Sequence, residues 1–159
     1  MSPRRPQRRR RFTPEEANAA LPLVRVIVRD LVRLSGELIE RRQRLALLVA
    51  RHQPDSSSLY REELAQIEEE LEKDTRRLQE YVEELRQLGV EPKSVTEGLV
   101  DFPATVDGRK VYLCWKLGEP EVLYWHDRHA GFQGRQPLLA AGSMAGDGSA
   151  GSGEGSLDE

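Results

Sequence analysis

Residues 20–48, ALPLVRVIVRDLVRLSGELIERRQRLALL, are the stretch that decides the fold. Steps of four and three residues alternate along it and connect Ala20, Val24, Ile27, Leu31, Leu34, Leu38, Arg41, Leu45 and Leu48, of which only Arg41 is not apolar. This spacing puts all nine side chains on one stripe of an α-helix, as in a coiled coil. The stretch therefore predicts a long amphipathic helix.

The start of this helix is predicted by residues 13–16, TPEE. The Thr13 hydroxyl can accept from the Glu16 amide while the Glu16 carboxylate accepts from the Thr13 amide, and Pro14 stands where a missing N–H costs nothing. Pro22 is different, because an interior proline costs a helix ~3 kcal/mol. We therefore expect a kink or a break near residues 20–22.

A second series with the same spacing follows, at Tyr60, Leu64, Ile67, Leu71, Asp74, Leu78, Tyr81, Leu85 and Leu88. The intervening residues 51–58, RHQPDSSS, are typical of a turn. The two helices should therefore run antiparallel, and Gly89 should end the second one as a left-handed cap.

Each helical stripe contains one polar member. Aligned about the turn, Leu34 faces Asp74, which leaves Arg41 about one heptad from Asp74 and predicts no direct ion pair between them. Two interpretations remain: polar positions that set the register and reach the solvated edge, or a notch that faces a partner. Four glutamates close together in the second helix point around its surface and predict a solvated face: Glu68, Glu69, Glu70 and Glu72.

From residue 99 the hydrophobic period changes to two. Asp107-Gly108 between alternating apolar runs is a strong hairpin signal, and we expect strands near 99–106, 109–117 and 121–126. Val111, Leu113, Trp115 and Leu117 should share one face of the middle strand, opposite Tyr112, Cys114 and Lys116; in the third, Leu123 and Trp125 should oppose Val122, Tyr124 and His126. The predicted fold class is α+β, with a long antiparallel helical hairpin followed by a small three-stranded antiparallel sheet.

The chain of 159 residues divides by composition into four parts. We expect a disordered arginine-rich head over 1–11, the hairpin over 12–91, the sheet with a GFQGR loop over 92–138, and a disordered Gly/Ser/acidic tail over 139–159. The arginines are followed by two glutamates and no apolar segment, so an export signal is not expected, nor is a membrane span. One cysteine excludes an internal disulfide framework and favours a cytoplasmic protein.

Four segments carry a resemblance: FTPEEANAALPLV, LVDFPA, VYLCWKLGEPEV and YWHDRHAGFQGRQPL. Over residues 12–138 the chain resembles the bacterial domain-of-unknown-function family numbered 2203. The resemblance implies a helical hairpin and a small sheet in bacterial cytoplasmic proteins of unassigned activity. The family's recurrent residues match Asp101, Phe102, Pro103, Cys114, Trp115, Gly118, Glu119, Trp125, His126, Gly131, Phe132, Gly134 and Arg135, but not His129.

The candidate functional cluster lies where the predicted strands meet turns: Asp101, Cys114, Glu119, His126 and Arg135. Asp101 could act as a base or a ligand, and Arg135 could clamp a phosphate or carboxylate. The structural alternative is that Asp101 caps a turn, Glu119 pairs with Arg135, and His126 bonds a buried carbonyl.

Two more specific hypotheses, a metal site and a cysteine nucleophile, use the same cluster. Asp101, Glu119 and His126 are weak metal candidates, with Cys114 or His129 as a further ligand, because the compact spacing of a zinc site is absent. A Cys114 nucleophile activated by His126 is a further alternative, although a mid-strand cysteine is more often buried and inert. No cofactor is assigned from these residues.

Three classes of function follow. The favoured one is an interaction or adaptor module that uses the hairpin as a coiled-coil arm for a protein partner or for self-association. The second is a metal-dependent or small-ligand-binding, enzyme-like site at Asp101, Glu119, His126 and Arg135. The third is weak, non-specific nucleic-acid binding through the head residues Arg4, Arg5, Arg8, Arg9, Arg10 and Arg11.

Overall fold

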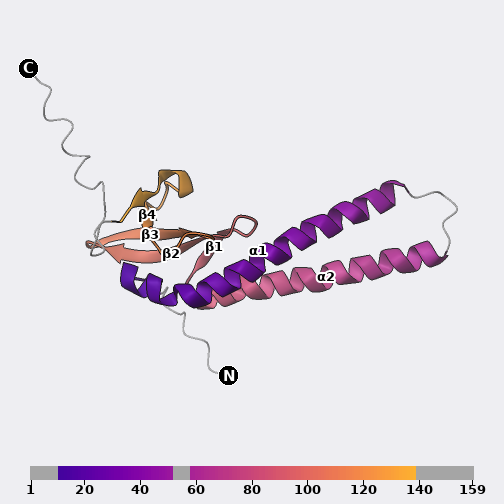
Figure 1. The fold of residues 1–159 in the computed structure, drawn as a ribbon, viewed down its shortest axis with the longest axis horizontal. Coiled ribbons are helices and arrows are strands. Elements are labelled where there is room, and N and C mark those ends of the chain that lie inside the picture. Colours follow the sequence, from indigo (N-terminus) through magenta and orange to yellow (C-terminus); the bar gives the residue numbers. More distant parts are fainter. Residues whose placement is uncertain (1–10, 52–57, 139–159) are drawn as a thin grey trace, which may run out of the picture.

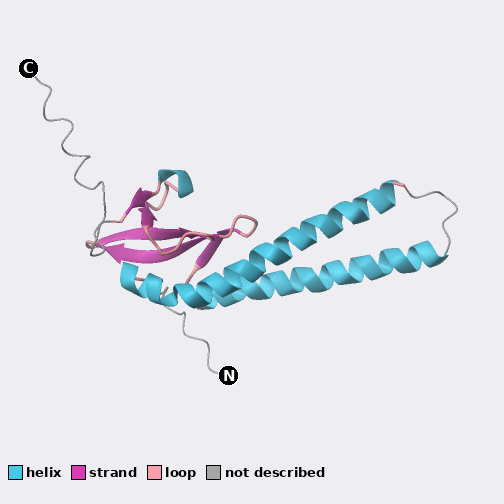
Figure 2. Ribbon diagram, viewed as in Figure 1, coloured by secondary structure: helices cyan, strands magenta, loops and turns pink. Residues whose placement is uncertain are grey.

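The computed structural model describes residues 11–51 and 58–138, which form two long helices and one antiparallel sheet (Figures 1 and 2). The helices are α1 (Pro14–Ala50) and α2 (Ser58–Gln87). The strands are β1 (Glu91–Ser94), β2 (Leu99–Val106), β3 (Arg109–Lys116), β4 (Tyr124–His126) and β5 (Gln136–Pro137), with the 3-10 turn η1 (Phe132–Gly134) before the last. The predicted disordered tail, the predicted head up to residue 10 and most of the predicted turn lie outside the described residues.

The capping box at the start of α1 is confirmed. The Glu16 amide donates to the Thr13 hydroxyl, and the Thr13 amide donates to the Glu16 carboxylate, each at 3.1 Å. A break at Pro22 is wrong, since the helix continues through it. Burial of Ala17, Leu21 and Val24 against the core compensates for the hydrogen bond that proline cannot donate. Figure 1 nevertheless shows the first turns of α1 running in a different direction from the rest.

The predicted antiparallel hairpin is confirmed, and each stripe member is less exposed than its neighbours along most of both helices. Near the sheet the stripe of α1 is buried, whereas beyond Leu38 its members are half-buried because only α2 covers them. We call residues 39–50 and 58–75 the arm; it extends away from the sheet in Figure 1. At the other end Gly89 has φ 88°, and the Val90 amide donates to the Leu85 carbonyl at 2.9 Å, as a left-handed cap requires.

The expectation that Arg41 and Asp74 do not pair is wrong, because the guanidinium and the carboxylate form an ion pair. An arginine side chain is long enough to bridge helix positions that are not directly opposite. The pair therefore occupies the one polar layer between the stripes, with the Arg41 side chain 36% and the Asp74 side chain 18% exposed. The glutamate cluster of α2 is solvent-exposed, as predicted.

The sheet has five strands in the order β1-β2-β3-β4-β5, not the three expected. The Asp107-Gly108 hairpin is confirmed, with φ 51° and 77° at the two turn residues. Strands β1 and β5 were not predicted, because the β1 sequence EPKS has no apolar alternation and β5 has only two residues. The third predicted strand begins at residue 124 instead of 121, because the Val122 amide donates to the Asn18 side chain of α1 at 2.7 Å.

The two faces of the sheet have different roles. One face supplies the core with the two tryptophans and with Val100, Phe102, Ala104, Val111 and Leu113, packed against α1 and the end of α2. The other, which we call the outer face, carries Asp101, Tyr112, Cys114, Tyr124 and His126, in agreement with strand alternation. The predicted alternation fails just before β4, where Val122 is buried with Trp125 and Leu123 is 37% exposed, because the Val122 amide is held by the Asn18 side chain of α1.

Among the described residues, neither helix has an apolar stretch of the length that crossing a bilayer demands.

Candidate functional site

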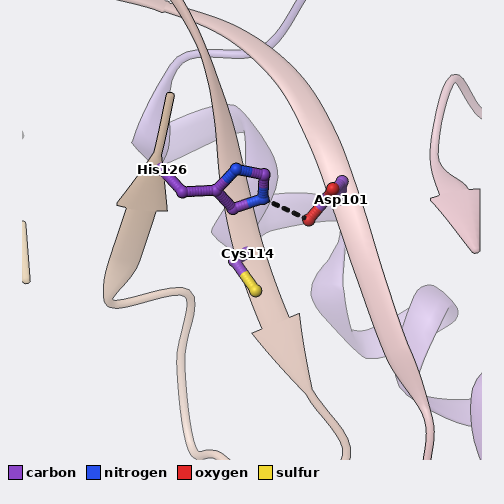
Figure 3. Close-up of side chains that lie close together, drawn as sticks. All are labelled: Asp101, Cys114 and His126. Atoms are coloured by element: carbon purple, nitrogen blue, oxygen red, sulfur yellow. Dashed lines mark hydrogen bonds and ion pairs between the residues drawn. The ribbon is translucent and has the colours of Figure 1, made fainter. Parts of the chain in front are cut away.

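Asp101, Cys114 and His126 come together on the outer face from three adjacent strands (Figure 3). Asp101 of β2 is opposite Cys114 of β3, and His126 of β4 is opposite Tyr112, two residues from the cysteine. One ligand atom from each of the three lies within 4.8 Å of the others. All three residues are at most 3% exposed, so the cluster is built into the sheet rather than placed on a loop.

His126 has both ring nitrogens occupied. Its Nδ1 is 2.8 Å from the Asp127 carbonyl oxygen, which can only accept, so Nδ1 carries a proton. Its Nε2 is 3.0 Å from Asp101 Oδ1. When the ring is an imidazolium, Nε2 also donates, and the contact with Asp101 becomes a buried ion pair.

The surroundings of His126 favour this charged form. Burial lowers the pKa of His126, but the hydrogen bonds to Asp101 and to the Asp127 carbonyl, together with the Asp101 charge, outweigh burial and raise it above 6.5. Tyr112 stacks on the imidazole with ring centroids 5.5 Å apart. The ring is therefore fixed in position and in protonation by its neighbours.

Cys114 is a thiol and not a thiolate. Burial raises its pKa to about 12, and the charge of Asp101 adds to the effect, whereas Arg135 acts in the opposite direction. A nucleophilic cysteine needs a lowered pKa and an accessible sulfur. The arrangement does not favour the Cys114–His126 nucleophile considered from the sequence, because His126 Nε2 is held by Asp101 instead.

Glu119 and Arg135 form a second, separate pair, as the structural alternative predicted. Arg135 Nη2 is 2.7 Å from Glu119 Oε2, and Glu119 Oε1 accepts from the Lys116 amide at 2.8 Å. The guanidinium also lies over the rings of Tyr124 and Phe132, 4.0 Å and 4.2 Å from their centroids. Through these contacts Arg135 holds the segment from η1 to β5 against the outer face. Asp101 does not cap a turn; its partner is His126.

A metal ion would use Asp101, Cys114 and His126, the group whose ligand atoms converge among the described residues. Glu119 and His129, considered as ligands from the sequence, are not part of this group. Coordination requires a thiolate and a free imidazole nitrogen. Here the thiol is protonated with Arg135 beside it, and both imidazole nitrogens have partners. A metal ion bound here would have to displace the thiol proton and the contact between His126 Nε2 and Asp101.

A pocket of about 300 Å³ lies over this pair. The buried Asp101 and His126 form its floor, and exposed residues from β1 and the segment after β4 surround it. Its full lining is Lys93, Leu99, Asp101, Tyr112, His126, Arg128, His129, Gly131 and Phe132. We call it the His126 pocket. Cys114 and Arg135 do not line it.

Sequence reasoning missed several residues of this region. Lys93 lies in the unpredicted strand β1, so no pattern connected it with the cluster. Tyr112 was predicted on the same face as Cys114, and Lys110 stands two residues before Tyr112 in the same strand, so the alternation was a usable signal. Of the six head arginines, only Arg11 is among the described residues; Arg4, Arg5, Arg8, Arg9 and Arg10 lie outside them.

Comparison with known proteins identifies a family without an activity. Residues 10–138 match the sequence model of a family described as uncharacterized conserved protein, DUF2203. Searches of curated proteins and of solved structures found no match. Because the match spans most of the chain and covers both helices and all five strands, this chain belongs to the DUF2203 family.

Proposed function

We propose that this protein binds a small anionic ligand in the His126 pocket. The observation that carries the proposal is the make-up of the pocket: a buried Asp101–His126 pair at its floor, aromatic rings in its walls, and cations at its edge. Convergent polar groups in a partly apolar cavity are typical of small-molecule sites. A cytoplasmic location, where a lone buried thiol stays reduced, is consistent with this proposal.

The charges around the pocket favour an anion. Lys93 and Arg128 are exposed at its edge, and neither has an ion-pair partner among residues 11–51 and 58–138. The Lys93 ammonium lies 5.7 Å from the centre of the Tyr112 ring. His126 and Asp101 neutralise each other at the floor, so the two free cations set the sign of the site. Tyr112 and Phe132 offer contact area to an apolar part of the ligand.

The geometry supports binding more than catalysis by these groups. A general base needs a nitrogen or oxygen free to take a proton from the substrate. His126 has none free, and Cys114 is protonated and outside the pocket. In an enzyme, the Asp101–His126 pair would first have to open.

A thermal-shift screen of full-length protein against carboxylates tests the proposal. A ligand present at 100 times its Kd stabilises the folded state by about 2.7 kcal/mol, which raises Tm by roughly 5 to 15 °C for a domain of this size. Lys93→Gln should abolish the shift. Lys73→Gln, which removes an exposed charge from the arm, should leave it unchanged. A panel without hits, or hits that persist in Lys93→Gln, would refute the assignment.

A second candidate function is self-association through the arm. Exposed apolar side chains near its end support an interaction role: Leu47 is 55%, Val49 54% and Leu59 70% exposed. The partner we propose is a second copy of this chain. From residue 41 the α1 side of the arm has only basic charged residues, whereas the facing part of α2 is mostly acidic. Two arms related by a twofold axis would bring each basic helix against an acidic one.

Sedimentation equilibrium across a concentration series tests the dimer. We expect dimers that dissociate in Leu47→Glu. Leu23→Glu is the matched control, because Leu23 is 54% exposed on α1 but lies outside the arm. A wild-type chain that stays monomeric throughout, or equal effects of both variants, would exclude the arm as the dimer contact.

A further inference from the structure

We infer that a second pocket on the outer face, formed around Arg11, Lys110 and Arg128, holds the phosphate group of a phosphate monoester. The pocket has a volume of about 270 Å³. Pro103, Val111 and Tyr112 complete its lining. We call it the cation pocket. It is distinct from the His126 pocket, although the two share Tyr112 and Arg128.

The fold brings three distant cations to this place. Phe12 bridges to Ala104 of β2 and is 1% exposed in the core. Arg11, the residue before it, lies at the edge of the cation pocket, where its Nη1 donates to the Ala104 carbonyl at 3.3 Å. Lys110 comes from β3, two residues before Tyr112 and thus on the same face, and Arg128 follows β4.

These three positive charges lie around one pocket without a paired carboxylate among the described residues. Among the described residues, none of Arg11, Lys110 and Arg128 has a carboxylate within ion-pair distance. The neighbouring Arg109 shows the usual arrangement, since its guanidinium is paired with Asp127 at 3.1 Å. Like charges gathered around one cavity repel one another and raise the local concentration of anions. A bound anion would remove this repulsion.

The number of cations indicates the kind of anion. A phosphate monoester carries a charge of about −1.5 to −2 at pH 7, whereas each phosphodiester of a nucleic acid carries one negative charge. Three cations around one small pocket match the more highly charged group. Arg11 and Arg128 can each offer a planar pair of donors to phosphate oxygens, and Lys110 adds a point charge.

Because the two pockets adjoin at Tyr112 and Arg128, one molecule could place its phosphate in the cation pocket and its body in the His126 pocket. That extension rests on the proposed function. The phosphate site itself does not, since a small phosphate ester needs the cation pocket alone.

The test is calorimetric titration of the full chain with phenyl phosphate at low salt. We expect saturable binding that weakens roughly tenfold or more in Lys110→Gln and in Arg128→Gln, since each removes a charge-assisted contact. Binding should stay within about twofold in Lys93→Gln, since Lys93 lines the His126 pocket and not the cation pocket, and in Lys73→Gln on the arm. All four positions are exposed, so the substitutions leave the core intact.

The contrary outcomes are equally distinct. Absence of saturable binding, or equal loss in Lys73→Gln, would overturn the inference. Loss in Lys93→Gln but not in Lys110→Gln would place the anion in the His126 pocket, which refutes the cation pocket while supporting the proposed function. A single-stranded RNA without terminal phosphates that competes for the site and depends on Lys110 would reassign it to nucleic-acid backbone.

Discussion

Replacing Asp101 by asparagine tests the buried pair at the floor of the His126 pocket. The Asp101 and His126 side chains are 3% and 4% exposed, and their atoms are 3.0 Å apart. Asparagine keeps the size of the side chain but removes the charge that faces the imidazolium. Breaking a buried pair by removing one partner costs about 3–5 kcal/mol. We expect Asp101→Asn to lower the free energy of unfolding by that amount in mild acid.

The cost should depend on pH in a defined direction. The pKa of His126 in the folded wild type is raised above its ordinary value. The pair therefore contributes its full stability below about pH 6.5, the pKa in the unfolded chain, and loses it as the pH rises through the folded pKa. Without Asp101, burial dominates and disfavours the charged ring. The difference between wild type and variant should thus be largest near pH 5.5 and shrink in alkaline solution.

Urea unfolding of both proteins at about pH 5.5 and about pH 9 measures this difference. An NMR titration of the imidazole signals gives the His126 pKa directly. Asp127→Asn is the matched control: its carboxylate is 55% exposed, and His126 bonds only its carbonyl, so it should cost less than about 1 kcal/mol at either pH. A His126 pKa at or below 6.5, or an Asp101→Asn cost that is equal at both pH values, would refute the ion-pair assignment.

Further predictions concern reactivity and packing. Because burial raises the pKa of Cys114 to about 12, the native thiol should resist iodoacetamide at neutral pH and react only in denaturant; rapid native labelling would contradict its assigned state. Gly98→Ala should destabilise the fold by about 1–3 kcal/mol, since φ is 73° and a Cβ would lie 2.7 Å from the nearest side-chain atom. Gly36→Ala should instead stabilise the fold by about 0.5–1 kcal/mol, because Gly36 lies on the open side of α1. Thermal unfolding of the two variants compares them. Leu31→Ala should lower the free energy of unfolding by about 2–5 kcal/mol. Leu71 is only half-buried, so Leu71→Ala should lower it clearly less, and denaturant unfolding of both variants measures the difference.

The helical hairpin was predictable because its signals are local and repeated. The stripe spacing, the capping box and the cap at Gly89 each concern residues within one or two turns, and all are confirmed. The ion pair of Arg41 with Asp74 was not predictable from the alignment, since side-chain reach is not part of a spacing pattern. Continuity through Pro22 depends on tertiary burial of the residues around it, which propensity does not contain.

The sheet and the site were predicted only where a local sequence pattern exists, and not where they depend on contacts between distant segments. Alternation in β2 and β3 correctly put Cys114 and Tyr112 on one face. Strand β1 has no such pattern, so Lys93 had no assigned place. The partner of Asp101 required the register of three strands, and the gathering of Arg11, Lys110 and Arg128 required the contact of Phe12 with β2. Contacts between distant segments are set by the assembled fold and not by local sequence.

The most direct measurement of the central claim, an anion site on the outer face, is a titration of uniformly ¹⁵N-labelled full chain with phenyl phosphate, followed by amide chemical shifts. We expect saturable shifts at Lys110, Tyr112 and Arg128, with residues 58–75 of α2 unaffected. Shifts confined to the arm, or shifts that grow without saturating, would contradict an anion site on this face of the sheet.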